Sequence, residues 1–165
     1  MASRGVHFAL SAEQAAPLLA AAAEGDDDAV MAAVEAIEEA WQEPFVAESD
    51  KAWEAIHRCL TGGTLLYEGG EYPLDHVICG GEQLLSGEAD DTASFVTAEQ
   101  VRDVASALAP LTKAWLRERY DRLDPDEYEG SDEDFEYTWE NFEAVRALFR
   151  RAAEAGRAVL FTVDG

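Results

Sequence analysis

The stretch GVHFAL, Gly5–Leu10, decides how this chain folds, together with its counterpart AVLFTV, Ala158–Val163. Val6, Phe8 and Leu10 alternate along the first stretch, so the two-residue period of a β-strand puts them on one face. The two predicted strands stand near opposite ends of the chain. A sheet that contains both must therefore join segments that are distant in sequence.

Helical patterns fill much of the sequence between these strands. Ser11 with Gln14 has the spacing of a capping box, which marks the first turn of a helix, and residues 97–100 (TAEQ) repeat this spacing. Two further strands are expected in the middle of the chain, at Leu74–Cys79 (LDHVIC) and at Ser94–Val96.

These elements predict a single α+β domain over residues 1–165, a length that suits one domain. The expected architecture is a small mixed sheet of three or four short strands, covered by five or six helices.

The stretch DKAWEAIHRCLTGG, Asp50–Gly63, contains a Trp, a His and a Cys, which belong either to a catalytic site or to the buried face of a helix. On a helix, Trp53, Ile56, His57 and Leu60 share one face, because they lie three, four and seven residues apart. Such a stripe predicts the buried side of a helix, with His57 as a core histidine whose ring packs on its neighbours.

The two cysteines and their neighbouring histidines do not have the geometry of a metal site. His57 and Cys59 would point about 200° apart on a helix, and His76 and Cys79 would face opposite sides of a strand. Zinc needs four converging ligands. We therefore expect no metal and no cofactor, and no motif in the sequence predicts a catalytic nucleophile.

The charge of the chain is strongly negative. It holds 35 Asp and Glu against 12 Lys and Arg, a net charge of −23. Nucleic acids and anionic membranes carry the same sign, so neither is expected as a partner, whereas a basic protein is. A composition bias that serves solubility is the alternative. The first residues lack the apolar stretch of a secretion signal, which predicts a cytoplasmic protein with reduced thiols.

Residues 124–143 are the most biased region, with ten acidic residues, five aromatic residues and no Lys or Arg. One interpretation is a solvated loop and helix start; the other is a surface that binds a basic partner. Exposed aromatic residues are common in binding surfaces. The candidate partner surface consists of Asp126, Glu127, Tyr128, Glu129, Asp132 and Tyr137.

A second candidate site involves the Gly80–Gly81 turn, whose backbone N–H groups could form an anion-binding nest. A plain tight turn is the alternative. The candidate small-molecule pocket consists of Lys51, Trp53, His57, Gly80, Gly81 and Glu82.

The order of these motifs resembles the YfbM-like family, a bacterial family of unknown function. The helix Asp50–His57 (DKAWEAIH), its Leu60–Gly62 end and the Gly80–Gly81 turn carry the resemblance, which extends over nearly the whole chain. The resemblance implies an α+β domain of this length and a cytoplasmic location, and it implies no reaction. It places a pocket, if the family has one, near Lys51–His57 and Gly80–Glu82.

Two classes of function stay open. The first, favoured by the charge, is a protein-binding module such as an inhibitor or immunity protein that acts on a basic protein. The second is a small-molecule-binding protein or enzyme with its pocket at His57 and the Gly80–Gly81 turn.

Overall fold

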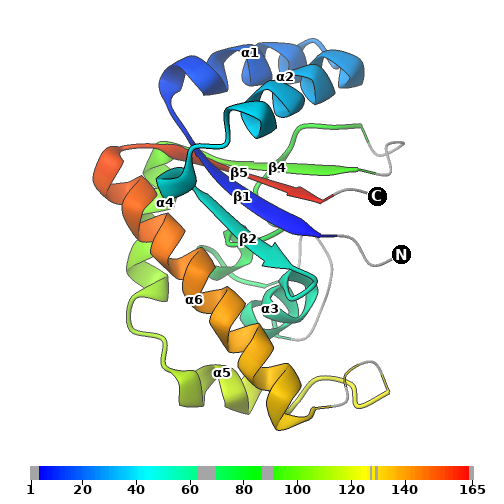
Figure 1. Cartoon of the computed structure of the whole chain (residues 1–165), viewed down its shortest axis with the longest axis vertical. Coiled ribbons are helices and arrows are strands. Elements are labelled where there is room, and N and C mark those ends of the chain that lie inside the picture. Colours follow the sequence, from blue (N-terminus) through cyan, green and yellow to red (C-terminus); the bar gives the residue numbers. More distant parts are fainter. Residues whose placement is uncertain (1–3, 63–69, 87–90, 127, 129, 164–165) are drawn as a thin grey trace.

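A computed structural model describes residues 4–62, 70–86, 91–126, 128 and 130–163 of the chain (Figure 1). These residues form six α-helices, five strands and two short 3₁₀ turns. In chain order the elements are β1 (Gly5–Leu10), α1 (Ala12–Ala23), α2 (Asp27–Ala40), a 3₁₀ turn (Glu43–Phe45), β2 (Val46–Asp50), α3 (Trp53–Leu60), a 3₁₀ turn (Leu74–His76), β3 (Glu82–Gln83), β4 (Thr92–Val96), α4 (Ala98–Leu108), α5 (Lys113–Tyr120), α6 (Asp132–Ala155) and β5 (Ala158–Val163).

The five strands make one sheet in the order β2-β1-β5-β4-β3, and every neighbouring pair is antiparallel. The first and last strands are paired along their whole length, from Gly5 opposite Val163 to Leu10 opposite Ala158. The α+β class is confirmed, as are the pairing of distant segments and the helix count. The expected mixed sheet of three or four strands is wrong, because the sheet is antiparallel throughout and has five strands.

The strand expected at Leu74–Cys79 is also wrong. Residues Leu74–His76 form a 3₁₀ turn, and Val77, Ile78 and Cys79 follow it as a buried turn. Their apolar character reflects burial beneath the sheet, which a short apolar run cannot distinguish from a strand. The additional strands β2 and β3 escaped detection because VAESD is half polar and Glu82–Gln83 has only two residues.

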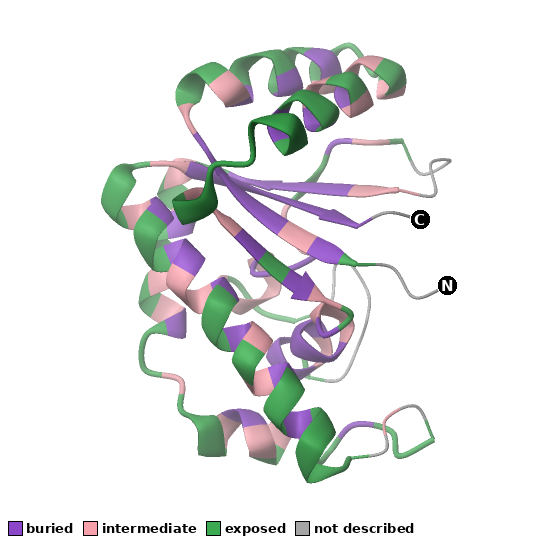
Figure 2. Cartoon of the chain, viewed as in Figure 1, coloured by how far each residue is buried: buried purple, intermediate pink, exposed green. Residues whose placement is uncertain are grey.

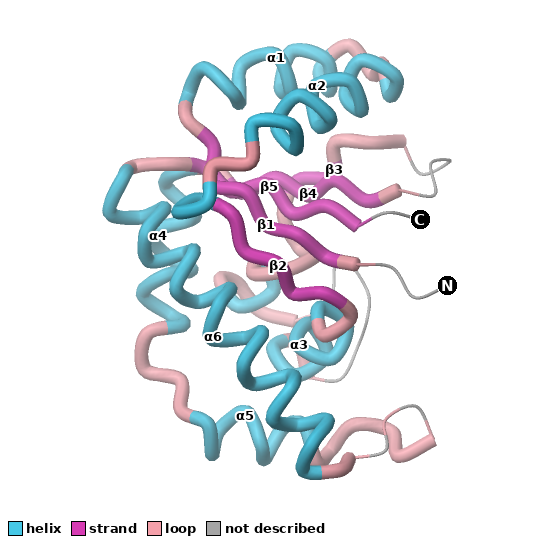
Figure 3. The backbone as a smooth tube through the Cα atoms, in the orientation of Figure 1, coloured by secondary structure: helices cyan, strands magenta, loops and turns pink. Residues whose placement is uncertain are grey.

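The helices cover the sheet on both sides, as Figures 1 and 3 show. The α1–α2 hairpin packs on one face, against Phe8, Leu10 and Leu160. Helices α3, α4, α5 and α6 form the other layer, and their core includes Ala9 and Phe161. Because successive side chains of a strand point to opposite faces, β1 and β5 contribute to both cores, and all six residues of β5 are buried (Figure 2).

His7 is a fully buried polar residue of β1 that packs against aromatic residues of the larger core. Its Nε2 lies 2.8 Å from the carbonyl oxygen of Val77, and its ring contacts Phe149 and Phe161. Burial lowers the pKa of His7 from 6.5 to about 4, although the bond to Val77 opposes the shift. The ring is therefore neutral at pH 7, and its Nε2–H donates to the Val77 carbonyl oxygen. This hydrogen bond connects β1 to the buried turn at Val77, Ile78 and Cys79.

We expect the free energy of unfolding to decrease as the pH falls from 6.5 toward 4. The unfolded chain protonates His7 below pH 6.5, while the folded protein protonates it only near pH 4, so the unfolded state binds more protons in between. The loss at about pH 5 is roughly 2 kcal/mol. Urea unfolding at pH 6.5 and at pH 5 measures this loss of free energy. His7→Gln should lose less stability over the same interval; an equal loss in both proteins would contradict the assignment to His7.

Candidate functional site

Helix α3 buries the face that its spacing predicts. Ile56 and His57 are fully buried and Leu60 is buried beside them, while Trp53 is half-buried with its ring 5.9 Å from that of Phe161. The prediction of a core stripe that contains His57 is confirmed. A fully enclosed imidazole has no surface at which to meet a substrate.

Lys51 and Glu82, the charged members of the predicted small-molecule pocket, are exposed. The Lys51 N–H donates to the Tyr137 hydroxyl (3.2 Å), and that hydroxyl donates to Asp50 Oδ2 (2.6 Å). Asp50 has a positive φ of 46°, so these contacts hold a sharp turn between β2 and α3. Tyr137 thus fastens α6 to this turn, with its ring 38% exposed.

The Gly80–Gly81 turn is shaped by close approach of the backbone to itself. A Cβ at Gly80 would lie 2.0 Å from the Asp75 carbonyl oxygen, and one at Gly81 would lie 2.6 Å from the Phe95 carbonyl oxygen. Both glycines are therefore needed for packing. Carbonyl oxygens this close repel an anion, which favours the tight-turn interpretation over an anion-binding turn.

We expect Gly80→Ala to destabilise the protein by about 3 kcal/mol, because the backbone at Asp75 cannot move aside without disturbing the buried turn. Gly25→Ala is the matched control. Gly25 has φ +71° with open space around its Cβ position, so only the left-handed backbone costs free energy, roughly 1 kcal/mol. Chemical denaturation compares the two variants, and equal costs would contradict the close-approach explanation.

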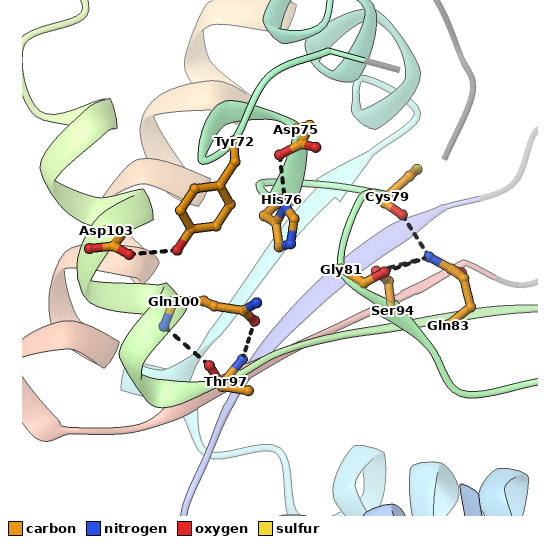
Figure 4. A network of polar contacts seen from close by, with 10 residues as sticks. All are labelled: Tyr72, Asp75, His76, Cys79, Gly81, Gln83, Ser94, Thr97, Gln100 and Asp103. Carbon is orange, nitrogen blue, oxygen red and sulfur yellow. Dashed lines mark hydrogen bonds and ion pairs between the residues drawn. The ribbon is translucent and has the colours of Figure 1, made fainter. Parts of the chain in front are cut away.

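A polar network surrounds this turn (Figure 4). Gln83 Nε2 donates to the carbonyl oxygens of Cys79 (2.7 Å) and Gly81 (3.1 Å) and lies 3.4 Å from Ser94 Oγ. One amide group thus ties the turn to β4. This arrangement accounts for the buried Ser94 and gives the network a structural role.

Two further polar pairs lie between this turn and α4. His76 Nδ1 lies 2.7 Å from Asp75 Oδ1, and the Tyr72 hydroxyl donates to Asp103 Oδ2 (2.6 Å). The rings of Tyr72 and His76 meet edge to face at 4.9 Å (Figure 4). The hydrogen bond to Asp103 is the main cause that raises the pKa of Tyr72 to about 12, so the phenol stays protonated. Its chemistry is that of a hydrogen-bond donor rather than a base.

Both cysteines are buried free thiols. Burial raises the pKa of Cys59 and of Cys79 to about 12, from an ordinary value of 9.0. Because the thiolate is the nucleophile, neither residue is activated for covalent chemistry.

We expect both thiols to resist Ellman's reagent in the folded protein at about pH 8, where a pKa near 12 leaves roughly one thiolate in ten thousand. After unfolding in guanidinium chloride, two thiols per chain should react. Absorbance at the product wavelength measures both states. Fast modification of either thiol without denaturant would show that it is neither buried nor inert.

The predicted acidic partner surface is only partly described. Glu127 and Glu129 lie outside the described residues, and Asp126 is exposed. Asp132 pairs with Arg117 (3.2 Å). Tyr128 is half-buried against the Tyr120 ring instead of projecting as an interface aromatic. Near this surface Glu136 pairs with Lys113, so cations of α5 neutralise part of the charge.

The sequence reasoning missed a second acidic surface, on the α1–α2 hairpin. A groove of about 540 Å³ runs between the two helices, with an almost wholly apolar lining. The lining residues are Gln14, Pro17, Ala21, Ala29, Ala32, Ala33, Ala36, Ile37 and Ala40. The signal was present in the sequence, because no Lys or Arg occurs between Arg4 and Lys51.

Exposed carboxylates adjoin the lining residues in the sequence of both helices. Glu13 and Glu39 stand next to lining residues of α1 and α2, and Asp28 and Glu35 do the same on α2; all four are exposed. Residues 12–40 carry eight acidic side chains and no Lys or Arg. The hairpin therefore combines an open apolar groove with charge of one sign.

Neither a metal site nor a membrane span is found in the described part of the chain. Its His, Cys, Asp and Glu side chains form no group of three or more that suits a metal ion. Its helices are too short or too polar to cross a bilayer.

The fold and its polar features are those of a family without an assigned activity: the chain belongs to the family described as "Domain of unknown function (DUF1877)", whose family model matches residues 1–162. A solved relative of this fold is the crystal structure of YfbM, a protein of unknown function from Escherichia coli. The two structures superpose with a TM-score of 0.66 and 18% identity, over 98% of this chain and 99% of that chain.

At this identity the likeness to YfbM shows the fold alone. Together with the family match it confirms the resemblance to the YfbM-like family. Among curated proteins, none matches the chain. The function is therefore argued from the surface itself.

Proposed function

We infer that this protein is an acidic protein-binding module whose partner is a basic protein, as an inhibitor or immunity protein would be. The observation that carries the inference is the α1–α2 groove, an apolar channel between two helices whose sequence holds exposed carboxylates and no Lys or Arg. The net charge of −23 supports it, because complementary charge speeds the encounter with a basic partner.

The groove favours one form of partner, a basic amphipathic helix. Its floor consists of small side chains such as Ala29, Ala33 and Ala36, so the backbone of a docked helix can approach closely. Amphipathic helices bind grooves of this kind through residues spaced three and four apart. Lys or Arg on the flanks of that helix would face Glu13 on one side and Glu39 on the other.

The hairpin suits this role better than the surface near residues 124–136. There Asp132 and Glu136 are already paired with Arg117 and Lys113, whereas the hairpin segment contains no cation. Glu13, Asp28, Glu35 and Glu39 form no ion pair with another described residue, so a partner can pair with them without displacing one. The predicted surface at Asp126 and Tyr128 is retained as the control.

The alternative function, a small molecule bound at His57 and the Gly80–Gly81 turn, has less support. His57 is fully buried, and carbonyl oxygens of Asp75 and Phe95 crowd the two glycines. Lys51 and Glu82 are exposed.

A designed peptide tests the proposal. A Leu- and Lys-containing helix of about 18 residues, about 27 Å long, should bind, whereas a scrambled peptide of equal charge should not. The fourfold variant with Glu13→Gln, Asp28→Asn, Glu35→Gln and Glu39→Gln should weaken binding by about tenfold. Isothermal titration calorimetry at low salt measures each affinity.

Two controls separate the groove from general acidity. Ala36→Tyr fills the groove without a change of charge and should also weaken binding. Four amide substitutions at Asp126, Asp132, Glu133 and Glu136 remove the same charge elsewhere and should leave the affinity within about twofold. Equal binding of the scrambled peptide, or equal loss in both fourfold variants, would refute a specific groove.

A further inference from the structure

A small cavity lies where the C-terminal ends of α3 and α5 meet. It has a volume of about 90 Å³ and is lined by Arg58, Cys59, Gly62, Arg119, Arg122 and Leu123. Three of these six residues are arginines, although the chain has only 12 Lys and Arg against 35 Asp and Glu. Arginine is therefore concentrated at this cavity.

Two of the arginines are held in place by their surroundings. Arg119 Nη1 donates to the Cys59 carbonyl oxygen (3.3 Å), and its guanidinium lies 4.4 Å from the centre of the Trp115 ring. The Arg58 side chain is only 19% exposed and has Glu54 at 3.5 Å. Arg119 is thus oriented by a carbonyl oxygen and an aromatic ring and Arg58 by a carboxylate, so a ligand would find both guanidinium groups prearranged.

Arg122 stands at the mouth of the cavity. Its side chain is 70% exposed, and Nη2 lies 2.7 Å from Glu118 Oε1. A guanidinium has five N–H donors, so a single contact with Glu118 uses a fraction of its capacity. Such an exposed ion pair is weak and can open to let the guanidinium turn toward a ligand.

The usual explanation for arginines at these positions is the helix dipole. A cation near a helix C-terminus stabilises the carbonyl groups there, and Arg58 and Arg119 lie in the last turns of α3 and α5. That effect accounts for one cation at each end. It does not account for a third guanidinium on one small cavity, because like charges at close range repel one another and Glu54 and Glu118 each pair with one arginine.

We propose that this cavity binds a phosphoryl group, either as free phosphate or as the terminal group of a small molecule. Guanidinium forks match the oxygens of phosphate, and three of them suit its three terminal oxygens better than the two of a carboxylate. The volume is that of about three water molecules, which limits the enclosed part to a single such group.

The remaining wall favours the charge interaction. Cys59 and Leu123 are buried, so this side of the cavity excludes water and strengthens the attraction between guanidinium and anion. Burial keeps the pKa of Cys59 near 12, and the neutral thiol adds no competing negative charge.

A titration with inorganic phosphate at constant ionic strength tests the proposal. Two-dimensional NMR of the amide groups follows Gly62, a lining residue, and we expect a saturable shift with a millimolar dissociation constant. Arg122→Gln, which is exposed and leaves the core intact, should weaken binding about tenfold. Arg119→Lys keeps the charge but loses the fork, and should weaken it similarly.

The controls decide between this site and general anion effects. Arg102→Gln removes an exposed arginine of α4 that does not line the cavity, and should bind phosphate like the natural chain. Phenyl phosphate should bind at least as well if the site takes the end of a larger molecule, and more weakly if it takes the free ion. Absence of saturation, equal binding of acetate, or unchanged affinity in both cavity variants would overturn the proposal.

Discussion

The antiparallel pairing of β1 with β5 is the constraint on which the rest of the structure depends. It joins Gly5–Leu10 to Ala158–Val163, the most widely separated strands in the chain. β2 then adds to β1 and β4 adds to β5, so the central pair supports both halves of the sheet. Every residue of β5 is buried, because the two helical layers close over it from opposite sides.

Charge divides between these two layers. The α1–α2 hairpin and the strands beside it, residues 5–50, carry no Lys or Arg, and the cations from Lys51 to Arg157 belong to the other part of the chain. Several of these cations pair with acids of their own layer, as Arg117 does with Asp121. The hairpin layer is thus acidic without any cation, whereas acids and cations are mixed in the other layer, and the sheet between them keeps the two surfaces on opposite sides of the molecule (Figure 1).

Local patterns predicted the elements that depend on local physics. Ser11 and Thr97 make capping boxes as their spacing predicts, and the α3 stripe is buried, because caps and helix faces depend on residues a turn apart. The errors came from segments whose state depends on distant partners. Val77–Cys79 is apolar because β1 and α4 cover it, and β2 is a strand because β1 offers it an edge.

The candidate sites also combine features that the local sequence predicts with features that depend on distant residues. Glycines at 80 and 81 were noticed in the sequence, but whether they frame an anion or pack on a carbonyl depends on where Asp75 and Phe95 come to lie. The cavity between Arg58 and Arg119 joins residues 61 apart in sequence, which no local pattern reports. The hairpin groove was foreseeable from its uniform charge and its alanines, yet only the packing of α1 on α2 makes it a groove.

The register of the central pair has a mechanical consequence. Because Gly5 lies opposite Val163, the start of β1 and the end of β5 lie side by side at the same end of the strands (Figure 1). The hydrogen bonds between antiparallel strands run perpendicular to them, so a force that separates these two ends loads the bonds one after another, like a zipper. A strand pair pulled in this direction yields at lower force than one sheared along its length. The same pairing that holds the fold together at equilibrium therefore offers little resistance to a force that pulls Gly5 and Val163 apart.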